Sequence, residues 1–147
     1  MALCSLIPRG HRVADVGTDH ARLPAYLVQR GITTRVIATD IRPGPLARAD
    51  RTICTHSLGN NIELRLGDGL TCVSPDEVDS IVIAGMGADT IIAILEASPW
   101  SRQKNLILQP MTHKERLLEF MGGAEPVIVF AKEGRREYCV MNYGSDC

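Results

Sequence analysis

The chain has 147 residues, of which 45% are hydrophobic and 22% charged, and its net charge at pH 7 is −1. This length suits one domain, and the composition excludes a disordered chain, a coiled coil and a collagen-like fibre. Because no apolar run approaches the roughly 20 residues of a membrane span, and Met1–Pro8 is too short for a signal peptide, we expect one cytoplasmic domain over residues 1–147 with no membrane partner.

Short apolar strands alternate with amphipathic helices from the start of the chain. Strands are predicted at Arg12–Val16 and Arg35–Thr39, where apolar residues are nearly continuous. A helix is predicted at Leu23–Gln29, because its apolar residues recur at helical spacing, and another at Pro45–Ser57, because proline favours a first helical turn. Each strand with its helix forms one unit of a repeating pattern.

The alternation continues through the middle of the chain. The next predicted elements are strand Ile62–Leu66, strand Asp79–Ala84, helix Thr90–Glu96, strand Asn105–Gln109 and helix Lys114–Met121. Glycine turns at Gly67–Gly69 and Gly85–Gly87 are expected to end the first two of these strands. Asp89 is expected to cap the helix that follows.

Residues 126–142 break this alternation. Pro126–Ala131 and Arg136–Asn142 read as two strands joined by a tight polar turn. Continuous apolar strands in five strand–helix units predict a parallel sheet that is covered on both faces, and the hairpin adds an antiparallel strand. The sequence therefore predicts an α/β fold with a doubly wound, mostly parallel, seven-stranded sheet and a C-terminal antiparallel hairpin.

The cysteines and histidines give no sign of a metal site. The four histidines are scattered, and the cysteines are odd in number, widely spaced and without a Cys-x-x-Cys pair: Cys4, Cys54, Cys72, Cys139 and Cys147. We therefore expect reduced thiols and no bound metal.

Charge is distributed unevenly along the chain. Residues 1–73 carry nine arginines against six acidic residues, and residues 74–147 carry seven basic against eleven acidic residues. Arginine suits bidentate phosphate contacts, so Arg22, Arg42, Arg48 and Arg51 are candidates to line a phosphate path. A solvated helix face explains Arg48 and Arg51 equally well.

Glycine and acidic residues gather where the predicted strands end, which is where ligands bind in sheets of this kind. The candidates are Asp15, Gly17, Asp19, His20, Asp40, Ile41, Gly67, Asp68, Gly69, Gly85, Met86, Gly87 and Gln109. Glycine lets the backbone approach a ligand closely, and carboxylates accept hydrogen bonds from ribose or amino groups. Any one loop is more simply a strand-to-helix turn, but five such loops at one edge indicate a binding site.

The first loop favours one class of ligand. Gly17 is followed by Thr-Asp-His-Ala-Arg, so the Gly-x-Gly-x-x-Gly signature for a pyrophosphate is missing, and no Walker A motif occurs. Asp19 would repel a diphosphate but accept hydrogen bonds from an ammonium group. The pattern therefore favours S-adenosyl-L-methionine, with its methionine part held by Asp15 and Gly17, its ribose hydroxyls by Asp40 and its adenine amino group by Asp68.

Several short blocks resemble the bacterial tRNA (adenine-22-N1)-methyltransferase family. They include Val13–Ala21, Arg65–Leu70, Ile83–Gly87 and Leu106–Pro110. The resemblance implies a Rossmann-like methyltransferase fold, S-adenosyl-L-methionine as cofactor, and tRNA as the partner whose adenine is methylated at N1. The chain departs from the family pattern at Arg22, Ala88 and Met111, and it ends at Cys147, without the C-terminal helical domain that the family carries.

The expected reaction needs few catalytic groups. N1 of adenine attacks with an in-plane lone pair, so positioning matters most, and a carboxylate would stabilise the cationic product. We assign that role to Asp19, with His20 beside it and Gln109 at a base edge, although Asp19 suits cofactor binding equally well. Met86 is expected to pack on the extruded adenine, and Trp100 either stacks on RNA or closes the sheet edge.

Two other functions stay open at this point. The chain is compatible with a methyltransferase for another RNA or a small molecule. It is also compatible with a domain that binds S-adenosyl-L-methionine without catalysis.

Overall fold

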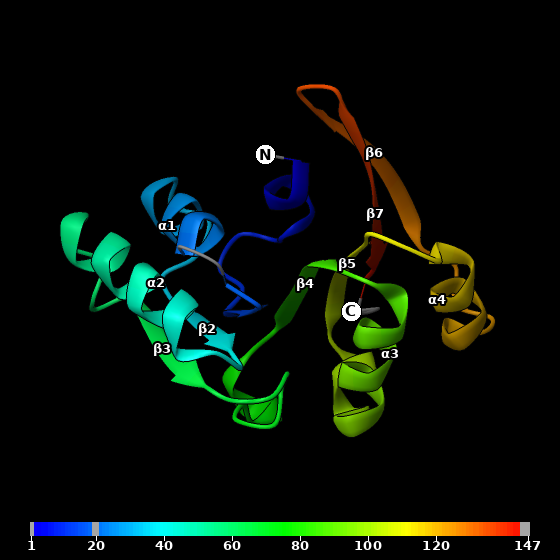
Figure 1. Cartoon of the computed structure of the whole chain (residues 1–147), viewed down its shortest axis with the longest axis horizontal. Helices are drawn as coiled ribbons and strands as arrows, with labels where there is room; N and C mark the ends of the chain where they lie inside the picture. Colours follow the sequence, from blue (N-terminus) through cyan, green and yellow to red (C-terminus); the bar gives the residue numbers. More distant parts are fainter. Residues whose placement is uncertain (1, 19–20, 145–147) are drawn as a thin grey trace.

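A mixed seven-stranded sheet runs through the centre of the computed structural model, which describes residues 2–18 and 21–144 (Figure 1). Its strands are β1 Val13–Val16, β2 Val36–Asp40, β3 Ile62–Leu66, β4 Ser80–Met86, β5 Asn105–Pro110, β6 Val127–Glu133 and β7 Arg136–Tyr143. They lie in the order β3-β2-β1-β4-β5-β7-β6. Strands β1 to β5 are parallel, and β7 is antiparallel to both of its neighbours, so the predicted fold class and terminal hairpin are confirmed.

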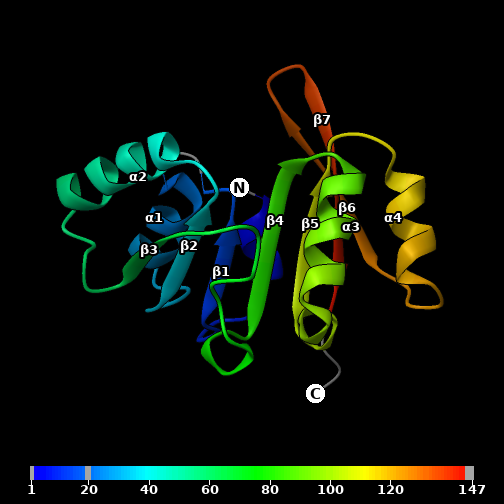
Figure 2. The same cartoon turned by 60° about the horizontal axis from the view of Figure 1, so that its bottom comes forward.

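Helices cover both faces of the sheet, and each half of the chain covers a different face (Figure 2). Helices α1 (Arg22–Gln29) and α2 (Pro43–Thr55) pack on one face together with the 3-10 helix Ala2–Leu6. Helices α3 (Ala88–Ala97) and α4 (Lys114–Met121) pack on the other. Because right-handed crossovers carry the chain outward in opposite directions, β1 and β4 meet at the switch point of the sheet.

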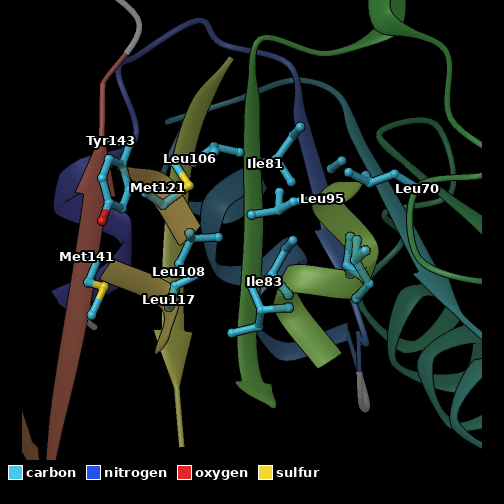
Figure 3. Packing of buried hydrophobic residues seen from close by; sticks show 14 of the residues in the cluster. Leu70, Ile81, Ile83, Leu95, Leu106, Leu108, Leu117, Met121, Met141 and Tyr143 are labelled. Carbon is cyan, nitrogen blue, oxygen red and sulfur yellow. The ribbon is translucent and has the colours of Figure 1, made fainter. Parts of the chain in front are cut away.

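The apolar strands are continuous because both of their faces are buried. Ile81 and Ile83 of β4 point toward α3, whereas Val82 between them belongs to the cluster on the opposite face (Figure 3). All three side chains are fully buried, and each stabilises the fold by roughly 1.5–3 kcal/mol. Because successive side chains of a strand point to opposite faces of the sheet, each strand contributes to two cores, one under each pair of helices.

Two expectations about β4 and α3 were wrong. β4 continues through Gly85 to Met86, because the pairing with β5 resumes at Met86 after a register shift and Gly85 takes a φ of +76°. Gly87 occupies the N-cap position of α3. The carboxylate of Asp89 instead pairs with Arg116 of α4 at 2.8 Å.

The sequence predicts five strand–helix units, but the described residues contain only four, because no α-helix follows β3. Between β3 and β4 the chain forms a loop with only the short 3-10 helix Pro75–Glu77. A longer 3-10 helix, Pro99–Gln103, precedes β5, and in it Trp100 is half-buried against the core. This placement favours the interpretation of Trp100 as a closing residue at the base of the sheet. Among the helices of the described residues, none has the length and apolar character needed to cross a membrane.

Arg65 of β3 holds the loop that follows its own strand. Its guanidinium donates to Glu77 Oε1 and Oε2 at 2.9 and 2.6 Å and to the carbonyl oxygen of Cys72 at 2.7 Å. Glu77 Oε1 also accepts from the backbone N–H of Ser74 at 2.9 Å. These bonds fold residues 66–77 back on the strand, and they hold the pKa of Glu77 at about 2, below its usual 4.5.

Replacing Glu77 tests how much this ion pair stabilises the fold. A carboxylate with a lowered pKa stabilises the folded chain fully above its ordinary pKa and loses that effect as the pH falls through the folded value. We expect Glu77→Gln to lower the free energy of unfolding by about 1–2 kcal/mol at pH 7, because the pair is partly exposed. In urea denaturation the difference should shrink between about pH 5 and pH 2. Glu119→Gln, at an exposed position of α4, is the control; a pH-independent loss in Glu77→Gln would contradict the ion-pair account.

Candidate functional site

A cavity of about 630 Å³ opens at the carboxyl edge of the sheet, beside the switch point. It lies between the ends of β1, β2 and β4, the loop after β3 and one face of α3. Its lining is Val16, Gly17, Thr39, Asp40, Ile41, Arg42, Arg48, Gly67, Asp68, Gly69, Thr71, Ala84, Gly85, Met86, Thr90, Ala93, Ile94 and Ala97. The volume lies within the usual range for a small-molecule site.

Most of the residues singled out in the sequence come together in this cavity. Eight of them line it: Gly17, Asp40, Ile41, Gly67, Asp68, Gly69, Gly85 and Met86. Asp15 and Gly87 are next to lining residues but are not part of the lining. Gln109 lies on β5, where it pairs with the lining residue Ala84 and is half-buried. Asp19 and His20 lie outside the described residues.

Asp40 is positioned to accept hydrogen bonds from a ligand. It ends β2, is only 7% exposed, and its Oδ1 accepts from the backbone N–H of Arg42 at 3.0 Å. Asp68, in contrast, is exposed on the loop after β3. The cavity therefore carries one buried and one exposed carboxylate at separate points of its wall.

Asp15 lies beneath the cavity in the middle of β1. Burial, together with a smaller contribution from the charge of Asp40 on the neighbouring strand, raises the pKa of its carboxyl from 3.8 to about 7. The hydroxyl of Thr18 opposes this rise, although its buried Oγ1 forms no hydrogen bond of good geometry with the described residues. A carboxyl in this state changes its charge near neutral pH, so a cation in the cavity would favour its ionised form.

Gly17 and Met86 close the floor of the cavity between β1 and β4. Gly17 has a φ of +76°, and a Cβ placed on it would come within 2.5 Å of Met86 Cε. The backbone N–H groups of Gly17 and Thr18 donate to the carbonyl oxygen of Thr39 at 2.8 and 3.1 Å, which ties this loop to β2. Any side chain at position 17 would therefore displace Met86 and strain the turn.

One wall of the cavity was not predicted from the sequence. It is formed by α3, through Thr90, Ala93, Ile94 and Ala97, and by Thr71. These four helical positions share one face at a spacing of three or four residues, and three of them are small. This face of small residues is the sequence pattern that could have indicated that α3 lines a cavity. Arg42 and Arg48, two of the candidates for a phosphate path, also line the cavity.

The chemistry of the lining suits an elongated polar ligand. Carboxylates accept from hydroxyl, amino or ammonium groups, while Ile41 and Ile94 offer apolar contact to a ring. Within residues 2–18 and 21–144 there is no group of three or more His, Cys, Asp or Glu side chains that could hold a metal ion.

Comparison with known proteins identifies similar chains. The family model described as a methyltransferase domain matches residues 1–138. The tRNA (adenine(22)-N(1))-methyltransferase of Bacillus subtilis (strain 168) is 40% identical over 117 residues, which are 78% of this chain and 49% of that protein. The chain thus spans about half the length of this curated relative.

The similar solved structures include two complexes with a ligand. Streptococcus pneumoniae Sp1610 in complex with S-adenosyl-L-methionine has a TM-score of 0.88 and 32% identity, and the match covers 99% of this chain and 72% of Sp1610. TrmK of M. capricolum in complex with S-adenosyl-homocysteine has a TM-score of 0.86 and 30% identity, with coverage of 99% and 66%.

The raised pKa of Asp15 predicts that its ionisation opposes folding. A carboxyl whose pKa rises from 3.8 to about 7 on folding lowers the free energy of unfolding as the pH rises between these values. We expect Asp15→Asn to remove this dependence, so its stability relative to the unmodified chain rises by roughly 3 kcal/mol from pH 4 to pH 8. Urea denaturation across this range measures it, with Asp50→Asn on α2 as the exposed control. Parallel stability curves for Asp15→Asn and the unmodified chain would exclude a buried carboxyl of raised pKa.

Proposed function

Because the chain belongs to the methyltransferase domain family, in the group of the tRNA (adenine-22-N1)-methyltransferases, we propose that it uses S-adenosyl-L-methionine to methylate N1 of an adenine in tRNA. The observation that carries the proposal is the cavity at the switch point, with Asp40 and Asp68 on its wall and Asp15 beneath it. Relatives of this group hold S-adenosyl-L-methionine or S-adenosyl-homocysteine in their solved structures.

The groups in and around the cavity fit this cofactor. Its ribose hydroxyls, adenine amino group and ammonium are all hydrogen-bond donors, and the acidic groups available to meet them are Asp40, Asp68 and Asp15. The buried Thr18 hydroxyl adds one more polar group near Asp15. A pyrophosphate ligand would instead face these carboxylates with like charge. The chemistry therefore favours the cationic cofactor over a dinucleotide.

Each part of the cavity has a distinct task in this proposal. Asp40 accepts from the ribose hydroxyls through its carboxylate, and Asp68 accepts from the adenine amino group at the open end. Ile41 and Ile94 pack against the faces of the adenine ring. The Gly17 turn lets the backbone approach the methionine part of the cofactor. The positive charge of the cofactor favours the ionised form of Asp15 below this turn.

In the proposed reaction the main task of the protein is to position N1 of adenine against the methyl group of the cofactor. The bound cofactor supplies a methyl group activated by attachment to a sulfonium sulfur. N1 of adenine carries a lone pair and no proton, so no base is needed before the attack. The methylated ring is a cation, and we assign Asp19 to its stabilisation, His20 to a place beside it and Gln109 to the base edge. These three roles rest on the sequence and on the resemblance, and a cytoplasmic location likewise stays a prediction.

Removing the Asp40 carboxylate tests the cofactor site. Because two charge-assisted hydrogen bonds to the ribose would be lost, we expect Asp40→Ala to weaken binding of S-adenosyl-homocysteine by about 2–4 kcal/mol in isothermal titration calorimetry. Asp50→Ala, an exposed substitution on the adjacent helix α2, should bind like the unmodified chain. Equal affinities for the two variants would mean that the ribose lies elsewhere.

Methyl transfer to tRNA tests the activity. We expect the chain to transfer label from methyl-labelled S-adenosyl-L-methionine to bulk tRNA, with N1-methyladenine as the modified nucleoside. Asp19→Asn should lower turnover about tenfold or more with little change in the Michaelis constant for tRNA, since the lost charge acts in the transition state. Label on another RNA or on a small molecule would point to a different substrate. Cofactor binding without any transfer would identify a non-catalytic binding domain.

A further inference from the structure

The β6–β7 hairpin rises past the end of the strand beside it. β7 pairs with β5 only through Met141, Asn142 and Tyr143, whereas its pairing with β6 continues to Arg136. Because β7 runs antiparallel to β5, the tip of the hairpin lies beyond the carboxyl end of β5. Figure 1 shows it projecting from the rest of the sheet. We call residues 129–140 the arm, and it stands at the same edge as the cavity.

The side of the molecule that carries the arm exposes an unusual amount of apolar surface. Four of the six large hydrophobic side chains that are exposed in the described residues lie on β6 or just after β5: Met111, Val127, Ile128 and Phe130. Phe130 is 69% exposed, so its ring contributes little to the core. Cys139 lies directly opposite it on β7. An aromatic ring in this position is available for stacking on a partner.

A notch separates the arm from the end of β5. It has a volume of about 400 Å³ and is lined by Pro110, Met111, Arg136, Glu137, Tyr138 and Cys139. The backbone N–H of Met111 donates to the carbonyl oxygen of Met86 at 2.8 Å. Since Met86 lines the cavity and Met111 lines the notch, the two hollows are neighbours across one hydrogen bond.

The charge at the tip of the arm differs from that of the surrounding chain. Residues 74–147 are acidic overall, yet three of the five residues at positions 132–136 are basic: Lys132, Arg135 and Arg136. Basic groups beside an exposed aromatic ring are the chemistry that binds single-stranded nucleic acid. Lys132 is a charged residue on the edge strand β6 and opposes edge-to-edge pairing of two such strands, which argues against a second copy of the chain as the occupant.

We propose that the arm and the notch bind an unpaired stretch of the RNA substrate next to the target adenine. A base stacks on Phe130, Arg135 and Arg136 contact the backbone phosphates, and the notch receives a neighbouring unstacked base against Tyr138. This inference rests on the proposed function, because it names the surface that presents RNA to the transfer site. The arm would then supply substrate contacts that the cavity itself does not.

Binding of fluorescein-labelled bulk tRNA, followed by fluorescence anisotropy, tests the arm directly. We expect Phe130→Ala to weaken binding about tenfold, because one stacked base is lost. The double variant Arg135→Gln/Arg136→Gln should reduce the slope of log affinity against log salt by about 1 to 2. Val127→Ala is the matched control, since Val127 is 60% exposed on the same strand but at its opposite end. All variants should keep the affinity for S-adenosyl-homocysteine and the melting temperature of the unmodified chain.

The outcomes separate the arm from the proposed activity. If the unmodified chain does not bind tRNA, or binds it as tightly after Phe130→Ala and the arginine changes, the arm is not an RNA surface. If light scattering shows a dimer that Phe130→Ala dissociates, the arm is a self-association surface and the proposal is overturned. If tRNA binds through the arm but no methyl group is transferred, the arm is an RNA-binding surface and the proposed methyltransferase activity is wrong.

Discussion

The parallel pairing of β1 with β4 is the constraint on which the rest of the structure depends. Val13 lies beside Ser80 and Val16 beside Ile83, and from these two strands the chain moves outward in opposite directions. No connection can then cross the carboxyl ends of both strands, so a hollow forms above them. The contact between Gly17 and Met86 closes its floor, which allows a ligand to lie across two halves of one sheet.

The cavity combines groups that are unfavourable for folding with groups that support them. Asp15 and Asp40 are carboxylates on neighbouring strands with little access to water, so their charges repel each other and their solvation is poor. Next to β2, Arg65 and Glu77 hold the loop that contains Gly67–Gly69 in place through a network of hydrogen bonds. The site is thus a place where stability is lowered locally and the scaffold around it is reinforced.

The position of the arm links substrate capture to the same edge of the sheet. An antiparallel strand beside β5 must send its hairpin turn toward the carboxyl ends of the parallel strands, where the cavity opens. The exposed ring of Phe130 and the basic tip therefore stand near the hydrogen bond that joins Met111 to Met86. The chain spans about half the length of its curated relative.

The sequence by itself determined the strands, the helices and the edge at which the ligand residues gather, because hydrophobic period and glycine turns are local properties of the chain. Asp40, Asp68 and Gly85 could be placed at one edge on that basis alone. Only the tertiary structure decided the bulge that extends β4 to Met86, the wall formed by α3 and the rise of the arm past β5. Each of these depends on register or packing between segments distant in the chain, which no local pattern encodes.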